Sequence, residues 1–159
     1  MKSLPYVHDT IKVTEKMCDH NGHMNVNYYY KLFDSVYTSF YIDELGFGED
    51  YLKSGFSTFT LEDSIRYLDE FTLGENVYPS FTLYKSNKKL LHFIGILQNK
   101  NLDIAAIFET VLAHIDLNQR KVVNFADDKI KHLQNVYLDQ RKMADIPFDI
   151  KLHIKDIDE

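Results

Sequence analysis

The chain has 159 residues, 45% of them hydrophobic, and its 18 Lys and Arg against 24 Asp and Glu give a formal net charge of -6. This length predicts one domain with a sizeable core, and neither charge sign forms a long block, which argues against a nucleic-acid-binding protein. With Cys18 as the only cysteine, no signal-peptide pattern in residues 1–12 and no apolar run near the ~20 residues that span a bilayer, we expect a soluble cytoplasmic protein without internal disulfides or membrane contact.

The first predicted elements are a short strand, a polar loop and a long helix. Polar and apolar residues alternate over Thr10–Glu15, which predicts the strand, and the loop Cys18–Asn25 follows. From Val26 to about Leu45, apolar residues recur at three- and four-residue steps, as in a helix with one buried stripe. Asn25 is the natural N-cap, and Gly46 is expected to end the helix.

The loop before this helix is the candidate site of chemistry. A carbonyl oxygen at the helix start would be polarised by free N–H groups and by the helix dipole. Asp19 could then attack that carbonyl or activate water. The alternative is structural, because Asp19 and Asn25 are residue types that also cap turns.

The second half of the chain predicts a series of antiparallel strands and a final helix. The first strand, between Phe56 and Phe71, alternates apolar odd positions with polar even positions, as a half-buried strand does. Pro79 in the second strand indicates an edge or a bulge. The next two strands are almost continuously apolar, so both of their faces should be covered. These later elements are expected at residues 77–84, 90–98, 104–115 and 122–125 for strands and at about 127–143 for the helix.

One early helix followed by consecutive antiparallel strands predicts an α+β fold in which a curled sheet wraps the helix. The motif Asp19-x-x-Gly22-His23-Met24-Asn25, followed by Tyr29, resembles the active-site loop of hotdog-fold acyl-CoA thioesterases of the 4-hydroxybenzoyl-CoA thioesterase type. The resemblance covers about residues 8–126, so we expect a single hotdog domain over residues 1–159, with a C-terminal helix and tail from about residue 127.

The resemblance implies hydrolysis of an acyl-CoA, with coenzyme A as part of the substrate and no separate cofactor. It implies that Asp19 is the nucleophile or general base and that the helix start binds the thioester oxygen. We also assign His23 and Asn25 to the catalytic group. His23 is expected to shape the loop rather than to act as an acid or base, and Asn25 is expected to shape the loop or, alternatively, to position water. The expected substrate-binding residues are Gly22, Met24, Val26, Tyr29, Glu62, Arg66 and Lys88. Cys18, His20 and His23 have spacings that a metal could use, but a flexible polar loop seldom holds a closed site, so no metal is expected.

Partner and substrate expectations also follow from the resemblance. Such proteins pair their sheets into dimers with active sites at the subunit boundary, so we expect a homodimer or homotetramer. Glu62 and Arg66 could then serve a neighbouring site, since a second carboxylate near Asp19 would raise one pKa. The alternative for Glu62, which we favour, is an exposed glutamate on a solvated strand face. Lys88 belongs to a lysine cluster that could bind the phosphates of coenzyme A, although such lysines often serve solubility.

Two further segments are similar to the thioesterases that cleave betainyl-CoA, namely Leu45–Tyr51 and Leu61–Glu70. A quaternary ammonium group would favour an aromatic cage with an acid nearby, which tyrosines and Glu62 or Asp63 could supply. The alternative function is a non-catalytic module that binds acyl-CoA without turnover. A hotdog hydratase fits less well, because its Asp and His are spaced further apart than Asp19 and His23.

Overall fold

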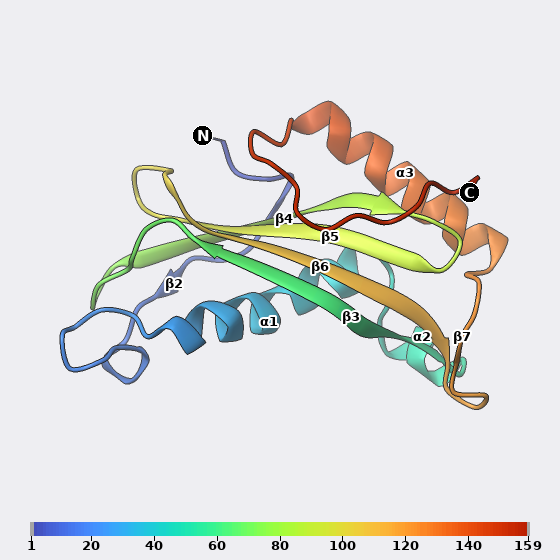
Figure 1. Ribbon diagram of the computed structural model, residues 1–159, viewed down its shortest axis with the longest axis horizontal. Coiled ribbons are helices and arrows are strands. Elements are labelled where there is room, and N and C mark those ends of the chain that lie inside the picture. Colours follow the sequence, from blue (N-terminus) through green and yellow to red (C-terminus); the bar gives the residue numbers. More distant parts are fainter. Residues whose placement is uncertain (1, 159) are drawn as a thin grey trace.

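The computed structural model describes residues 2–158 and shows an antiparallel sheet that curls around helix α1 (Figure 1). The order of the long strands is β4-β5-β6-β3, with β1 and β2 pairing with β4 and β7 pairing with β6. The strands are β1 (Tyr6–Val7), β2 (Ile11–Lys12), β3 (Phe56–Tyr67), β4 (Asn76–Ser86), β5 (Leu90–Gln98), β6 (Ile104–Asp116) and β7 (Lys121–Val122). The helices are the 3-10 turn η1 (Glu15–Met17), α1 (Val26–Asp43), α2 (Glu49–Lys53) and α3 (Asp127–Met143). The expected α+β plan, a curled sheet around one long helix, is confirmed.

Helix α1 packs its predicted stripe against the concave face of the sheet. Phe33 and Phe40 are fully buried, and the Phe33 ring stacks on Phe108 of β6 with centroids 4.9 Å apart. The close approach requires a glycine on β5, because a Cβ atom at Gly95 would lie 2.5 Å from the ring of Phe81 and 3.2 Å from that of Phe33. The central core is therefore largely aromatic.

The opposite, outer face of the sheet is covered by α3 and by the chain that follows it (Figure 1). Leu4, Ile94, Ile96 and Ile107 are buried there, and Phe148 of the tail packs against them. Gln140 of α3 accepts hydrogen bonds from the backbone N–H of Leu83 (2.7 Å) and from the hydroxyl of Thr82 (3.1 Å). The expectation that β5 and β6 are covered on both faces is confirmed, and the helix to which the sequence assigned no role is one of the covers.

The prediction for β3 is wrong about which apolar side chains are buried. Phe59, Leu61 and Tyr67 are 43%, 54% and 50% exposed. The strand lies at the end of the sheet order, and its pairing with β6 shifts register between Thr60 and Glu62, so Leu61 forms a bulge. Because a one-residue insertion exchanges the faces of a strand, a strict odd-even pattern does not hold across it.

Two short elements also differ from prediction. The expected strand at Thr10–Glu15 is ordered as β2 only over Ile11–Lys12, because the chain turns into η1 after the buried Val13. The strand expected at 122–125 is β7, Lys121–Val122, and the backbone N–H of Phe125 bonds to the carbonyl of Lys88 instead. Pro79 lies where the ladder of β1 stops, as its missing N–H predicts. Within residues 2–158, no helix has the length and hydropathy that a membrane span needs.

Candidate active site

The predicted loop is a fixed structure, tied on one side to η1 and on the other to the segment before β4. The backbone N–H of Asn25 donates to Met17 (2.8 Å), and that of Met24 donates to Phe71 (2.7 Å). Gly22 has a φ of +80°, a conformation that favours glycine, and its carbonyl accepts from the N–H of Leu73 (2.9 Å). Met24 is buried in the core, so its side chain helps to anchor the loop rather than to line an exposed site.

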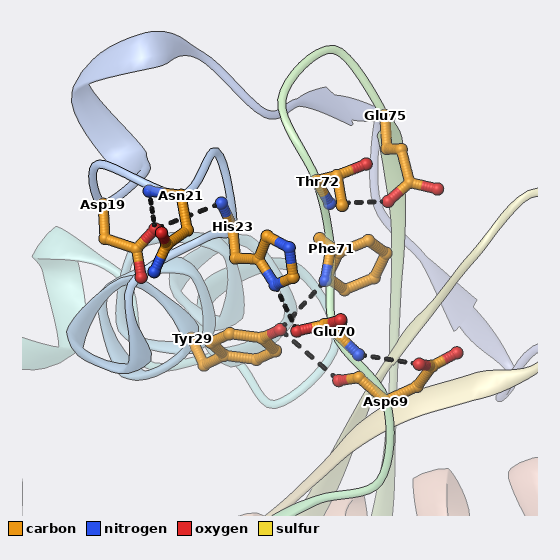
Figure 2. Close-up of polar contacts among 9 residues, drawn as sticks. All are labelled: Asp19, Asn21, His23, Tyr29, Asp69, Glu70, Phe71, Thr72 and Glu75. Atoms are coloured by element: carbon orange, nitrogen blue, oxygen red, sulfur yellow. Dashed lines mark hydrogen bonds and ion pairs between the residues drawn. The ribbon is translucent and has the colours of Figure 1, made fainter.

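The two oxygens of the Asp19 carboxylate have different surroundings. Oδ1 accepts hydrogen bonds from the backbone N–H groups of Asn21 (2.9 Å) and His23 (3.3 Å) (Figure 2). Oδ2 has no hydrogen-bond partner in the described part of the chain, and the residue is exposed. Oδ1 of Asp19 therefore stabilises the turn, as the structural alternative predicts, while Oδ2 is free to contact a ligand or water.

Asn25 is the N-cap of α1, as predicted. Its Oδ1 accepts a hydrogen bond from the backbone N–H of Asn27 (3.0 Å), and its carbonyl accepts from that of Tyr28 (2.9 Å). The N–H of Val26 has no such partner within residues 2–158, and Val26 is 52% exposed. The first turn thus offers one free amide at the positive end of the helix dipole.

The side chain of His23 contacts that of Glu70, and no local pattern in the sequence indicates this pair. Its Nδ1 contacts Oε2 of Glu70, which lies 47 residues further along the chain (Figure 2). Glu70 belongs to the segment between β3 and β4, whose Thr72 forms an isolated β-bridge with His23. Sequence reasoning missed Glu70 because only the tertiary fold brings the two segments together.

Tyr29 of α1 is hydrogen-bonded to the backbone of the segment that carries Glu70. Its hydroxyl donates to the carbonyl of Asp69 (3.4 Å) and accepts from the backbone N–H of Phe71 (3.1 Å) (Figure 2). The side chain is buried, and burial raises the pKa of its phenol, with the nearby Glu70 and Asp69 carboxylates adding to the effect. Tyr29 is therefore a neutral hydrogen-bonding support for the site.

A group of tyrosines and acids extends from this site along β3. Tyr67 packs edge-on against Tyr29 with centroids 5.3 Å apart, and the hydroxyl of Tyr30 donates to Asp63 (3.3 Å). Tyr30 and Tyr67 are 42% and 50% exposed. The surface beside the loop thus combines aromatic rings with carboxylates.

Three of the predicted binding residues lie away from the Asp19 loop in the structure. Arg66 is on the outer face, where it donates to Glu109 (3.3 Å) and to the carbonyl of Asp149 (2.6 Å). Glu62 is exposed and pairs with Val111 of β6, so its side chain also lies on the outer face. Lys88 is in the β4–β5 hairpin, beside Phe125 and far along the sheet from the Asp19 loop. Within residues 2–158, no three side chains of metal-ligand type come together.

A cavity of about 560 Å³ lies between α2 and the start of α3, and no residue of the Asp19 loop lines it. It is lined by Tyr51, Phe56, His114 and Lys129 among others. Tyr51 and Nε2 of His114 share a hydrogen bond of 2.6 Å, and Lys129 donates to the carbonyl of Gly46 (2.9 Å). The Asp19 loop contacts the segment between β3 and β4 instead, and Asp19 itself is exposed.

The family model and the curated relatives that match this chain both carry the name thioesterase. Residues 13–151 match the family model of the thioesterase-like superfamily. The L-carnitine dehydrogenase/betainyl-CoA thioesterase of Rhizobium meliloti (strain 1021) is 31% identical over 113 residues, which cover 70% of this chain and 23% of the relative. The corresponding protein of Ruegeria pomeroyi is 31% identical over 103 residues, covering 65% and 21%. The chain therefore spans under a quarter of the length of these relatives.

Solved structures show the same fold. A hypothetical protein from Staphylococcus aureus, determined in complex with CoA, has a TM-score of 0.82 and 24% identity, and 98% of each chain is covered. A DHNA-CoA thioesterase from the same organism has a TM-score of 0.73 and 17% identity, with 89% of this chain and 96% of that chain covered. At these identities the similarity concerns the fold alone.

Proposed function

Because this chain belongs to the thioesterase-like superfamily, we propose that it hydrolyses an acyl-CoA thioester at the Asp19 loop, releasing free CoA and a carboxylic acid. The observation that carries the proposal is the position of Asp19, on a loop tied on both sides and adjacent to the start of α1. One carboxylate oxygen maintains the loop, and the other faces solvent. A substrate is thus offered a fixed carboxylate and a helix N-terminus together.

The proposed chemistry uses these two features in turn. The thioester carbonyl oxygen lies at the first turn of α1, where the free N–H of Val26 and the helix dipole stabilise the negative charge that develops on it. Oδ2 of Asp19 acts as the nucleophile or as the base that activates water. Asn25 holds the turn in place as its N-cap.

We propose further that a second copy of the chain completes the substrate pocket. Strand β3 is an edge of the sheet, and its exposed Phe59, Leu61 and Tyr67 are side chains that an edge in solvent would be expected to avoid. Pairing of two β3 strands around a two-fold axis is antiparallel, so the Tyr67 end of one copy meets the Phe56 end of the other. The Asp19 loop, which contacts the segment that follows Tyr67, would then lie near the Phe56 end of the second copy's β3, in a homodimer or a tetramer built from it.

The acyl group that the surface fits best is a cationic one. The relatives from Rhizobium meliloti and Ruegeria pomeroyi are named betainyl-CoA thioesterases. Beside the loop, Tyr67 is half-exposed against Tyr29, and Tyr30 is bonded to the carboxylate of Asp63. Aromatic faces next to carboxylates attract a quaternary ammonium group. We therefore propose betainyl-CoA or a similar cationic acyl-CoA as the substrate.

The test is the release of free thiol by the purified chain from betainyl, short aliphatic, long aliphatic and benzoyl CoA thioesters, with Asp19→Asn measured in parallel. The asparagine Oδ1 can still accept from the N–H groups of Asn21 and His23, so the variant keeps the loop and loses the reactive oxygen. We expect a loss of at least about 10²-fold, the scale of acid–base or nucleophilic groups. Binding of acyl-CoA without turnover by the wild type would instead identify a non-catalytic module.

A further inference from the structure

The pair formed by His23 and Glu70 plays no part in a hydrolysis that uses only Asp19 and the helix start. Nδ1 of His23 contacts Oε2 of Glu70 (Figure 2). An ionised carboxylate only accepts hydrogen bonds, so the hydrogen of this contact is on Nδ1. In the neutral ring the lone pair is then on Nε2, and within the described residues no group is bonded to that nitrogen. His23 therefore carries a proton acceptor that the protein itself does not use.

Glu70 is held in place by the core of the protein. The hydroxyl of Tyr29 bonds to the residues on both sides of it, the carbonyl of Asp69 (3.4 Å) and the N–H of Phe71 (3.1 Å). The N–H of Glu70 itself donates to Oδ1 of Asp69 (2.9 Å). Because Tyr29 is only 4% exposed and belongs to α1, the helix fixes the backbone from which Glu70 reaches His23.

His23 is in turn fixed relative to Asp19. Its backbone N–H donates to Oδ1 of Asp19 (3.3 Å), and its carbonyl accepts from the N–H of Asp19 (2.9 Å). Figure 2 shows the His23 ring between the Asp19 loop and the segment that carries Glu70. Asp19 is thus linked to the backbone of His23, and the His23 ring is linked to Glu70.

On the basis of the thioesterase function, we propose that Glu70 is a positioning residue that holds His23 in the Nδ1–H tautomer, so that Nε2 receives a proton from the hydrolytic water. The arrangement follows the general rule that a base is oriented by a third group. It also assigns the nucleophilic role to Asp19, because the base is then His23.

The reaction balances in two steps. Oδ2 of Asp19 attacks the thioester carbonyl carbon, a C–O bond forms, the C–S bond breaks, and CoA leaves as a thiolate. Water then attacks the acyl carbon of the Asp19 anhydride and gives one proton to Nε2 of His23. The bond from the acyl carbon to Asp19 breaks, the Asp19 carboxylate is restored, and the proton on Nε2 passes to the CoA thiolate.

A surface ion pair is the competing explanation, since the side chains of His23 and Glu70 are 41% and 60% exposed. Exposed pairs contribute little to stability, so a pair of that kind needs no anchoring. The two bonds of Tyr29 favour positioning, because they attach the backbone on both sides of Glu70 to a buried side chain.

The first measurement is the tautomer of His23, by ¹⁵N NMR of the imidazole nitrogens at a pH where the ring is neutral. We expect Nδ1–H in the wild type and in Glu70→Gln, whose side-chain oxygen still accepts, and the Nε2–H form in Glu70→Ala. The control is Glu75→Gln, which removes a carboxylate from the same segment between β3 and β4. Glu75 accepts from the N–H of Thr72 (2.6 Å) and does not contact His23, so this variant should keep the wild-type tautomer.

The second measurement is turnover and intact mass with the thioester that the wild type hydrolyses fastest. We expect Glu70→Ala to lower kcat about 10- to 100-fold, the scale of one hydrogen bond to a charged group, and to accumulate the acylated protein. Because only deacylation is slowed, KM should fall together with kcat, and kcat/KM should stay at the wild-type value. His23→Ala should lose about 10²- to 10⁴-fold. Glu75→Gln should turn over like the wild type.

The outcomes separate this inference from the proposed function. Wild-type tautomer and turnover in Glu70→Ala would overturn the positioning role while leaving the thioesterase function in place. If the wild type hydrolyses no thioester, the thioesterase function fails and the catalytic part of the inference fails with it. The NMR result still decides in that case whether Glu70 selects the tautomer of His23.

Discussion

Replacement of Glu109 by glutamine should destabilise the fold strongly, because this buried carboxylate holds the C-terminal segment on the sheet. Glu109 is fully buried on the outer face of β6. It accepts hydrogen bonds from the backbone N–H groups of Lys151 (2.9 Å) and Leu152 (3.0 Å), and from the side chains of His92 (3.2 Å) and Arg66 (3.3 Å). Glutamine has the same shape, but it carries no charge and has one acceptor oxygen instead of two.

The size of the effect follows from these partners. Removing one member of a buried charge pair costs about 3–5 kcal/mol, since the remaining charge of Arg66 loses its partner. For a chain of this length, each 1 kcal/mol lowers Tm by about 2–4 °C, so Glu109→Gln should lower it by about 6–20 °C. The expected loss is larger than that of an ordinary surface substitution.

The pKa of Glu109 determines how the stability of the fold should change with pH. Burial alone would raise the pKa of Glu109, but the hydrogen bonds from His92, Leu152 and Lys151 outweigh it and hold the pKa below its usual value. A carboxyl group with a lowered pKa in the folded state contributes stability above its unfolded pKa, and this stability is lost as the pH falls through the folded value. The wild type should therefore lose stability on acidification, and Glu109→Gln should show a flatter acid limb.

Urea denaturation followed by circular dichroism measures both effects at neutral and acidic pH. Hydrogen exchange adds a local measure, because the amides of Lys151 and Leu152 should lose protection in the variant. The matched control is Glu49→Gln, an exposed carboxylate on α2 that pairs with Lys53. If the free energy of unfolding of Glu109→Gln lay within about 1 kcal/mol of the wild type, Glu109 would not be what holds the C-terminal segment on the sheet.

Two further perturbations test the core and the cavity. Gly95→Ala should cost about 1–3 kcal/mol of unfolding free energy, because the new Cβ would lie 2.5 Å from the ring of Phe81; an unchanged urea midpoint would contradict this packing. Burial lowers the pKa of Lys129 to about 8, so between pH 8 and its usual 10.5 the unfolded chain binds more protons and stability should rise with pH. Lys129→Met should flatten that rise in thermal melts, and an unchanged slope would assign it to another group.

The helices could be predicted from the sequence because their signals are local. The apolar spacing from Val26 onward, the cap at Asn25 and the end of α3 at Met143 depend on residues within one or two turns. Their bounds agree with the structure to within two residues. The long strands β5 and β6 were equally clear, since they are covered on both faces and their apolar residues are therefore continuous.

The environment of β3 could not be predicted in the same way. Its alternation indicates a strand but does not show which strands lie beside it. Strands β4, β5 and β6 are neighbours in that order, and within residues 2–158 β3 pairs only with β6, so β3 is an edge strand. The bulge at Leu61 then exchanges the two faces between Phe59 and Asp63. Arg66, which the sequence suggested for a binding site, follows the bulge and keeps the polar face that the alternation predicts. The alternation does not show that this face is the outer one, where Arg66 pairs with Glu109.

Asp19 shows why the two interpretations of a polar loop are not exclusive. A residue that only stabilises the turn needs one acceptor oxygen, and Oδ1 supplies it by bonding to the N–H groups of Asn21 and His23. Asparagine would meet that requirement equally well, so the turn alone does not explain a carboxylate. What the carboxylate adds is the second oxygen Oδ2, on an ordered loop that leads into α1, whose Val26 amide has no partner among the described residues. In the proposed reaction the turn and the chemistry therefore use the same side chain, because the bonds that fix Oδ1 also limit the directions in which Oδ2 can point.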